Sequence, residues 1–320
     1  MKLFRRRTLI IGTGEQAQQF LATVNRLYPN NEIVGCLRVS TKHDIRVDES
    51  LCVGMYDDLQ QMVDCHSATT LVFAEPGLQK EQVYALLAMP AYASLSIYVA
   101  TNLTDKTYEG VKTTLLEEMQ LHQLSAVRMP HYQRCVKRFF DFILSLIALL
   151  ILAPFIVVCC LIIGKRPIYK QERIGRRGKV FLIYKLRTMC LDAEKKGPQL
   201  SSEDDPRITR IGRFLRRYRL DEVTQFYNVI KGDMSLIGPR PERWFYFRQI
   251  VQEQVDAYLL CNVRPGISSM GVVKYGYASN LSMMLNRMEY ELTYYKKLSL
   301  WLDLKIVFGT ITTILRGRGV

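Results

Sequence analysis

The chain has 320 residues, a length that predicts two domains. Lys and Arg number 44 against 30 Asp and Glu, so the formal charge is +14 and the partners are expected to be anionic, whether nucleic acid, lipid or a phosphorylated substrate. Eight cysteines without a CxxC pair argue against a disulfide framework and against a zinc site, and they are typical of a reduced, cytoplasm-facing protein. No N-terminal signal peptide is recognised.

Residues 8 to 100 alternate short apolar runs with segments of helical periodicity. This alternation predicts a parallel α/β sheet, and we assign residues 1–101 to a Rossmann-like domain. The expected strands are 8–11, 33–39, 70–74 and 95–100, and the expected helices are 16–27, 57–64 and 79–89.

The turn after the first expected strand reads Gly12-Thr13-Gly14-Glu15-Gln16-Ala17, a G-x-G-x-x-A pattern that lets a pyrophosphate approach a helix N-terminus. Two features weaken that interpretation. The second strand ends without an acidic residue for a ribose, and Glu15 puts a negative charge where a phosphate would bind. A fold that keeps only the turn geometry is favoured over a working dinucleotide site.

Residues 102–136 are polar and are interpreted as a connector between the domains. Its later part, residues 111–124, is predicted to be a linking helix. His122 stands apart from any acid-rich cluster, so a structural role is favoured over a ligand or catalytic role.

Phe142 to Ile163 is a run of 22 residues without a charge, long enough to cross a bilayer. Pro154 lies near its midpoint, where a proline kinks a helix. Basic residues flank both ends, although a spanning segment normally has its excess on one side. We therefore predict a re-entrant membrane helix over residues 137–166 that enters and leaves by the same face, in preference to a buried helix of a soluble protein.

Residues 167–320 are predicted to form a mostly helical α+β catalytic domain. Within it, Lys185 and Arg187 alternate with apolar residues in a strand-like stretch, which puts both cations on one face. The acidic loop from Ser201 to Asp205 is interpreted as solvated structure. The C-terminal segment Leu300–Leu315 is an amphipathic helix that would lie on the membrane or on the core, with the core favoured.

The segment from Arg207 to Pro241 contains six arginines before Asp221 and Glu222, and a Gly/Pro-rich turn after them contains Arg240. Guanidinium groups pair with phosphates and carboxylates bind hard cations, so this density is typical of a phosphate and metal site. A basic surface helix is the alternative. Neighbouring residues on a helix point about 100° apart, so the two carboxylates share one centre only at a helix end or through a metal. Arg216 lies on roughly the same helical face as Asp221.

Several motifs in order resemble those of the bacterial sugar transferases, the monotopic polyprenyl-phosphate hexose-1-phosphate transferases, between Lys137 and Leu315. Those motifs are Lys137-Arg138-Phe139-Phe140-Asp141, Tyr184 to Met189, Asp205-Pro206-Arg207-Ile208-Thr209, Leu220-Asp221-Glu222, Asn228 to Pro241, and Arg264-Pro265-Gly266-Ile267. Larger relatives of this family carry a similar Rossmann-like module ahead of the transferase.

The resemblance implies a phosphoglycosyl transferase. It would pass a sugar 1-phosphate from a nucleoside-diphosphate sugar, most simply a UDP-sugar, to polyprenyl (undecaprenyl) phosphate, starting a capsule, O-antigen or exopolysaccharide repeat unit. Asp221 would be the nucleophile that forms a covalent phosphosugar, and Glu222 would assist it, with Mg²⁺ or Mn²⁺ on both carboxylates. The implied substrate-binding residues are Lys185, Arg187, Arg216 and Arg240.

The same resemblance implies a monotopic protein on the cytoplasmic face of the bacterial inner membrane, in contact with phospholipid and without a nucleic-acid partner. A homo-oligomer is left open. Two other classes remain as alternatives: an NAD(P)-dependent oxidoreductase that uses the N-terminal domain, and a non-catalytic basic membrane adaptor whose binding would weaken uniformly with salt.

Overall fold

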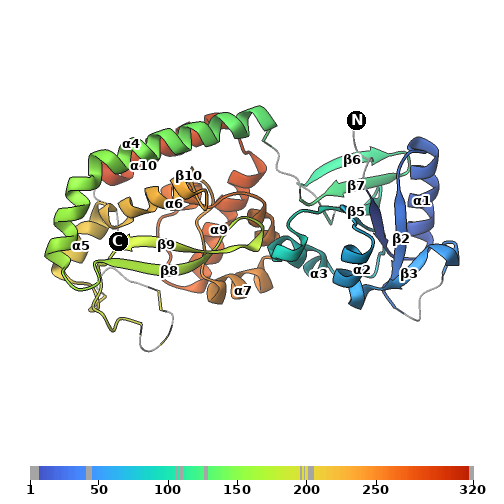
Figure 1. Ribbon diagram of the computed structural model, residues 1–320, viewed down its shortest axis with the longest axis horizontal. Coiled ribbons are helices and arrows are strands. Elements are labelled where there is room, and N and C mark those ends of the chain that lie inside the picture. Colours follow the sequence, from blue (N-terminus) through green and yellow to red (C-terminus); the bar gives the residue numbers. More distant parts are fainter. Residues whose placement is uncertain are drawn as a thin grey trace. The chain divides into compact units, whose positions relative to one another are not determined.

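The computed structural model describes residues 7–40, 45–105, 107–108, 111–125, 129–194, 197, 199–200 and 205–316. The chain forms two compact units, Met1–Ala126 and Val127–Val320, which are described separately here (Figure 1).

The first unit is built on a sheet that has seven strands in the described residues, in the order β3-β2-β1-β4-β5-β7-β6. Strands β1 to β5 pair in parallel with one another, whereas β7 pairs antiparallel with both β5 and β6. The strands are β1 (Thr8–Ile11), β2 (Ile33–Arg38), β3 (Cys52–Met55), β4 (Thr70–Phe73), β5 (Ser96–Asn102), β6 (Lys112–Leu116) and β7 (Met119–Gln123), and the helices are α1 (Glu15–Leu27), α2 (Leu59–Cys65) and α3 (Lys80–Ala85). The predicted parallel α/β sheet is confirmed.

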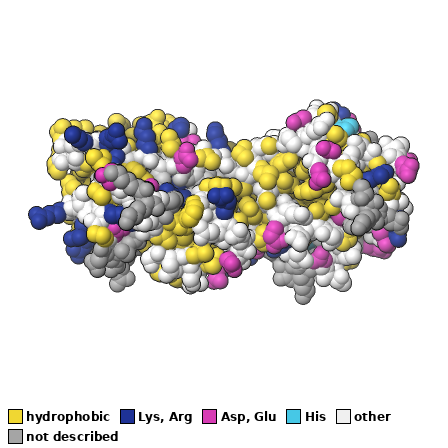
Figure 2. Space-filling model, turned by 90° about the horizontal axis from the view of Figure 1, so that it is seen from below, with side chains coloured by type: hydrophobic (Ala, Val, Ile, Leu, Met, Phe, Trp, Pro, Cys, Tyr) yellow, Lys and Arg dark blue, Asp and Glu magenta, His cyan; other side chains and the backbone are white. Residues whose placement is uncertain are grey.

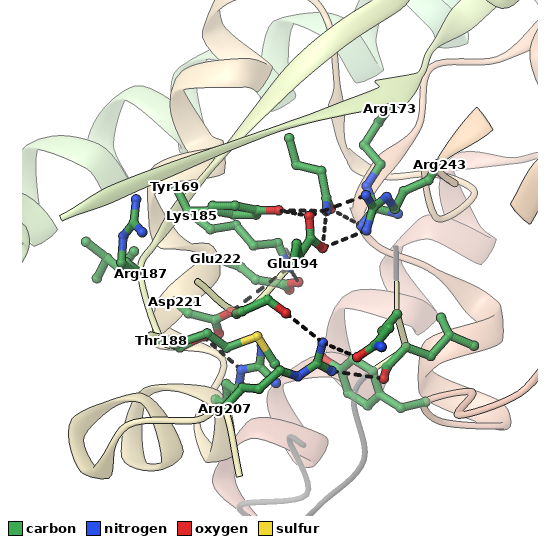
Figure 3. Close-up of a pocket in the computed structure, with 18 of the residues that line it drawn as sticks. Tyr169, Arg173, Lys185, Arg187, Thr188, Glu194, Arg207, Asp221, Glu222 and Arg243 are labelled. Atoms are coloured by element: carbon green, nitrogen blue, oxygen red, sulfur yellow. Dashed lines mark hydrogen bonds and ion pairs between the residues drawn. The ribbon is translucent and has the colours of Figure 1, made fainter. Parts of the chain in front are cut away.

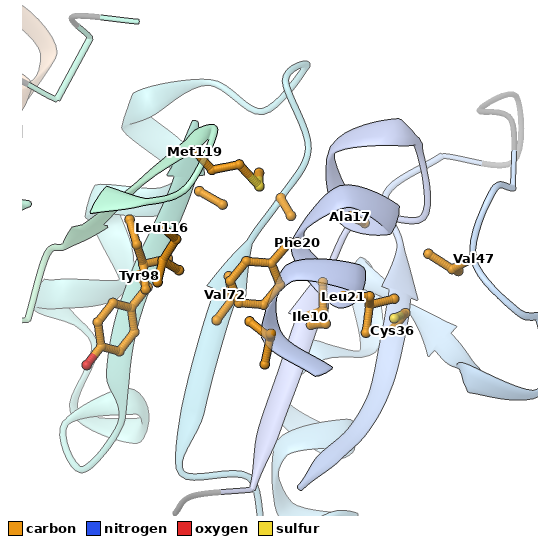
Figure 4. Packing of buried hydrophobic residues seen from close by; sticks show 14 residues of the cluster. Ile10, Ala17, Phe20, Leu21, Cys36, Val47, Val72, Tyr98, Leu116 and Met119 are labelled. Atoms are coloured by element: carbon orange, nitrogen blue, oxygen red, sulfur yellow. The ribbon is translucent and has the colours of Figure 1, made fainter. Parts of the chain in front are cut away.

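The central strands form from short runs of mostly apolar residues, as expected when both faces of a strand are covered. Every residue of β1 and β4 is buried. Figure 4 shows Phe20 and Leu21 of α1 over Ile10 of β1 and Val72 of β4, in one apolar cluster that continues to Met119 of β7. The buried apolar residues of α1, whose helical spacing predicted this helix, are the ones that pack in the cluster.

The predicted helix over residues 111–124 is wrong, because these residues form the β6–β7 hairpin at the edge of the sheet. Thr113 and Thr114 favour a strand, and Glu117 takes a left-handed conformation (φ 51°) at the turn. The compact unit therefore continues to residue 126, beyond the boundary expected at 101. His122 is buried between Thr101 Oγ1 and Thr113 Oγ1, each at 2.9 Å, and burial lowers its pKa, consistent with a structural role.

The glycine turn after β1 has the tight geometry that its pattern predicts. Gly12 has φ 124°, and a Cβ there would lie 2.4 Å from the carbonyl oxygen of Ala74, so only glycine fits. Glu15 Oε2 accepts from Arg46 Nη1 at 3.0 Å. A carboxylate therefore stands beside the turn.

The second unit begins with α4 (His131–Ile163), a helix of 33 residues that starts six residues before the predicted segment and includes Pro154. It is the one helix in the described residues that is long and apolar enough to cross a membrane, and only 6% of its most apolar window is buried. The alternative of a buried soluble helix is therefore wrong. Figure 1 shows α4 bending near its C-terminal end, the part that contains Pro154.

Both ends of α4 are attached to the same unit. Near its start, Arg138 donates to the carbonyls of Val229 (2.7 Å) and Ile230 (3.1 Å), and Lys137 Nζ lies 2.7 Å from Asp303 Oδ2. Toward its end, Phe155 and Cys159 pack in an apolar cluster with Leu215 and Val223. The exposed apolar surface of α4 therefore lies between two anchored ends.

The rest of the second unit is mostly helical, with two small sheets. β8 (Ile168–Ile174) and β9 (Val180–Leu186) form an antiparallel hairpin, and β10 (Ser235–Ile237) pairs parallel with β11 (Gly266–Ser268). The helices are α5 (Arg210–Arg217), the 3₁₀ helix η6 (Leu220–Gln225), α6 (Phe226–Lys231), α7 (Trp244–Glu253), α8 (Met270–Lys274), α9 (Leu281–Lys296) and α10 (Leu300–Leu315).

Helix α10 packs on the core with one face, which is the position favoured from the sequence. Asp303 and Ile306 are buried against the unit, whereas Trp301, Phe308 and Leu315 are 63–79% exposed. The core therefore covers only one stripe of this helix.

The excess positive charge belongs entirely to the second unit. The sequence to Ala126 has 11 Lys and Arg against 14 Asp and Glu, so the remainder has 33 against 16. Figure 2 shows Lys and Arg side chains clustered on the second unit, on the left, and carboxylates spread over the first. Anionic partners are therefore expected at the second unit.

Candidate active site

A cavity of about 230 Å³ lies in the second unit between the β8–β9 hairpin and η6. Side chains of η6 and α6 hold the edge of β9 in place. Thr224 Oγ1 donates to the carbonyl of Tyr184 at 2.8 Å, and Asn228 bonds both Leu182 O (2.7 Å) and Tyr184 N (3.2 Å). These bonds fix Lys185, the next residue on β9, opposite Glu222.

The chain between α5 and η6 breaks at Arg219, which has a left-handed conformation (φ 57°, ψ 23°). A non-glycine residue rarely adopts it. Asp221 and Glu222 lie in the first turn of η6, just after this break. They are therefore at a helix end, where two neighbouring side chains can face the same centre.

Glu222 is the centre of a buried cluster of cations. Its Oε1 lies 2.7 Å from Lys185 Nζ and 3.7 Å from Arg240 Nη2, and its Oε2 lies 2.7 Å from Arg219 Nη2. Burial by itself would raise the pKa of Glu222, but the three cations outweigh it and hold this pKa well below its ordinary value. Glu222 is therefore a carboxylate at neutral pH.

Asp221 is placed differently, although it is the adjacent residue. Its nearest cation is Lys185, with 4.0 Å between Nζ and Oδ2, and it makes no side-chain hydrogen bond to the described residues. Burial raises the pKa of Asp221, while the Lys185 ammonium opposes the rise. The Asp221 carboxylate lines the cavity and is free to meet a ligand there.

All six residues predicted for the site line this cavity. Arg216 reaches it although the helix is interrupted before Asp221, and its Nε donates to Thr188 Oγ1 at 2.9 Å. Arg187 lies just past the end of β9 and donates to the carbonyl of Arg166 at 2.7 Å, away from the carboxylates (Figure 3). The guanidinium of Arg240 lies over the ring of Tyr277, 5.2 Å from its centroid.

Arg219 is a residue of the site that was not among those predicted, because regular helical spacing places it about 200° away from Asp221. Arg219 is 6% exposed, pairs with Glu222 and lies on Tyr277 at 5.7 Å from the ring centroid. Tyr277 comes from the loop before α9 and was not predicted. The packing of Arg219 and Arg240 on the ring of Tyr277 joins residues that are far apart in the sequence, so no local pattern predicts it.

The interpretation of Asp205 as solvated is wrong, whereas Ser201 to Asp204 lie outside the described residues. Asp205 is 4% exposed and pairs with Arg207, which also donates to the carbonyl of Ala193 at 3.0 Å. Glu194 pairs with Arg243 at 2.7 Å (Figure 3). These pairs hold the segment after β9 against the cavity.

The donor set limits the kind of metal site that fits. Among the described residues, no group of three or more His, Cys, Asp or Glu side chains is able to hold an ion. Mg²⁺ commonly takes one or two carboxylates, several waters and substrate phosphates. The open carboxylate of Asp221 fits that mode, whereas both oxygens of Glu222 already face cations.

Arginines, a lysine and one open carboxylate around a cavity are the groups expected of an enzyme that acts on phosphates. The family model described as bacterial sugar transferase matches residues 132–317, and the chain belongs to this family.

Curated relatives agree with this assignment. The UDP-N-acetylgalactosamine-undecaprenyl-phosphate N-acetylgalactosaminephosphotransferase of Aeromonas hydrophila is 38% identical over 73% of this chain and 55% of its own length. The UDP-glucose:undecaprenyl-phosphate glucose-1-phosphate transferase of Escherichia coli is 35% identical over 56% of this chain and 40% of its own length. The undecaprenyl-phosphate galactose phosphotransferase of Salmonella typhimurium is 30% identical over 76% and 52%. The chain thus spans about half the length of these relatives.

Proposed function

We propose that this protein is a phosphoglycosyl transferase that moves a sugar 1-phosphate from a nucleoside-diphosphate sugar, a UDP-sugar in the first instance, to polyprenyl phosphate. The observation that carries the proposal is the contrast between the two adjacent carboxylates. Glu222 is neutralised by Lys185, Arg219 and Arg240, while Asp221 stays open to the same cavity. The names of the relatives support the donor and acceptor classes.

In the proposed first step, an Asp221 carboxylate oxygen attacks the β-phosphorus of the donor. The bond from that phosphorus to the bridging oxygen breaks, and the nucleoside monophosphate leaves with the electron pair. In the second step, a phosphate oxygen of the polyprenyl phosphate attacks the same phosphorus and releases the Asp221 carboxylate. The lipid then carries a diphosphate-linked sugar, the first unit of a surface polysaccharide.

The cations of the cavity would bind the phosphates in both steps. Arg216 lines the cavity beside Asp221, and Arg240 is held against Tyr277. Lys185 is fixed by Glu222, so we infer that Glu222 orients the lysine and the arginines. When bound, Mg²⁺ or Mn²⁺ would neutralise the donor diphosphate, and Asp221 is the residue that would hold it.

The acceptor is insoluble in water, so the site must lie at a membrane. Helix α4 provides the apolar surface, with Phe139, Leu150 and Leu161 each 62–77% exposed. We propose that α4 is a re-entrant helix on the cytoplasmic face of the inner membrane, since both of its ends are anchored to the second unit.

The proposal is tested by incubating the membrane-embedded protein with single UDP-sugars and polyprenyl phosphate and measuring nucleotide release. We expect repeated turnover with one or a few sugars only when the lipid is present, because without it each protein can release at most one nucleotide as Asp221 is modified. Excess chelator should abolish it and Mg²⁺ or Mn²⁺ should restore it, because the donor diphosphate and the carboxylates otherwise repel one another. No release with any donor would contradict the function, and full activity in chelator would contradict the metal.

The membrane topology gives a separate prediction. Single cysteines at the exposed positions Cys65 and Lys179→Cys, in a chain otherwise free of cysteine, should both resist a membrane-impermeant thiol reagent in intact cells and react after permeabilisation. A helix that crossed the membrane would put these positions on opposite sides. Labelling of either one from outside would overturn the re-entrant arrangement.

A further inference from the structure

A second cavity, of about 80 Å³, lies at the start of α4. It shares no lining residue with the cavity around Asp221. Its walls come from α4, the β8–β9 turn and the loop before β11. Five of its lining side chains are cationic: Arg134, Lys137, Arg138, Arg176 and Arg264.

The anionic groups at this cavity do not balance those cations. Lys137 pairs with Asp303 at 2.7 Å, so this lysine is already neutralised. The one carboxylate in the lining is Asp141, whose oxygens accept from Ser235 Oγ (2.6 Å) and Leu236 N (3.2 Å). Four guanidinium groups therefore face one carboxylate.

Two of the arginines are held in place by one nitrogen only. Arg176 Nε donates to Asn262 O at 3.2 Å, and Arg264 Nε donates to Gly232 O at 3.0 Å. Their terminal Nη groups have no acceptor among the described residues. Burial, followed by the charges of Arg177, Arg264 and Arg134, lowers the pKa of Arg176 to about 10, as expected where positive charges gather without a counter-ion.

We propose that this cavity is a binding site for a phosphate-bearing anion, held by the Nη groups of Arg176 and Arg264 with Arg134 at its exposed mouth. Planar guanidinium groups pair bidentately with phosphate. The volume corresponds to about two or three waters at roughly 30 Å³ each, room for a tetrahedral oxyanion and too little for a nucleotide sugar.

The position of the cavity fits the headgroup of an anionic phospholipid. Phe139 and Phe140, which follow Lys137 and Arg138 on α4, are 62% and 53% exposed and begin its apolar surface. A phosphate in the cavity would therefore lie where lipid meets water. Soluble phosphate offers the same chemistry without the acyl chains, and the two sources are separable by experiment.

The test uses the full chain in a non-ionic detergent, without sugar donor, titrated with inorganic phosphate in one arm and dihexanoyl phosphatidylglycerol in the other. The dissociation constant is measured by calorimetry. Arg176→Gln should weaken binding by about tenfold or more, the loss expected for a charged hydrogen-bonding contact. Arg134→Gln should weaken it less, and it serves as the second variant because its side chain is exposed and makes no hydrogen bond to the described residues.

Arg177→Gln is the matched control, because it removes the same charge one residue away, from an exposed side chain outside the cavity. Its binding should stay within about twofold of the wild type. If Arg176→Gln weakens binding of both inorganic phosphate and the lipid, the cavity is assigned to phosphate itself. If it weakens binding of the lipid alone, the cavity is assigned to a lipid headgroup. Either result supports the site. Equal weakening by Arg176→Gln and Arg177→Gln, or unchanged binding in both Arg176→Gln and Arg134→Gln, would overturn it. The result does not depend on transferase activity.

Discussion

Replacing Asp221 with Asn is expected to reduce turnover by about a thousandfold or more while the protein stays folded and membrane-bound. The amide has nearly the same volume but is not a nucleophile, and Asp221 makes no hydrogen bond whose loss would unfold the chain. Nucleotide release with UDP-sugar and polyprenyl phosphate is the measurement. In wild type incubated with donor alone, mass spectrometry should find a sugar phosphate on the peptide that contains Asp221.

Asp233→Asn is the control for this variant. It makes the same chemical change in a carboxylate that pairs with Lys231 at 2.9 Å and does not line the cavity, so its turnover should stay close to wild type. Turnover of Asp221→Asn above a few per cent of wild type, with deamidation excluded, would refute the covalent step.

Replacing Glu222 with Gln is expected to cost about 3–5 kcal/mol of stability, because it leaves Lys185, Arg219 and Arg240 buried without their shared counter-ion. For a unit of this size that corresponds to a fall in the unfolding temperature of roughly 10 °C. Turnover should fall as well, since the cations that would bind phosphate lose the group that orients them.

The pH dependence of this effect has a defined sign. The pKa of Glu222 is depressed in the folded chain, so its stabilisation is fully present above the unfolded-state pKa of about 4.3 and is lost as the pH falls through the lower folded-state value. The difference between wild type and Glu222→Gln should therefore be largest near neutral pH and shrink in acid.

Glu194→Gln provides the comparison for stability. Glu194 also pairs with an arginine, Arg243, at 2.7 Å, but its side chain is 35% exposed, and such a pair contributes about 1 kcal/mol or less. If Glu222→Gln unfolds within a degree or two of Glu194→Gln at neutral pH, Glu222 is not the counter-ion of the cluster.

Local periodicity was sufficient to predict much of the fold. The runs that became β1, β4 and β5 are short and mostly apolar, and the spacing of α1 marks one buried face, so each signal lies within a few neighbouring residues. The β6–β7 hairpin was missed because its strands are short and carry several polar residues, and the pairing of β7 with β5 involves residues about 20 positions apart.

By itself the sequence determined the chemistry available to the site: adjacent carboxylates, a dense run of arginines, and an apolar segment long enough to cross a membrane. The tertiary structure decided how that chemistry is divided. Arg219 turns the chain into a left-handed conformation, and a lysine 37 residues away together with Arg219 and Arg240 then occupies Glu222 and leaves Asp221 open. The physical reason is that a charge interacts according to distance in space, and helical spacing does not predict distance once the helix is broken.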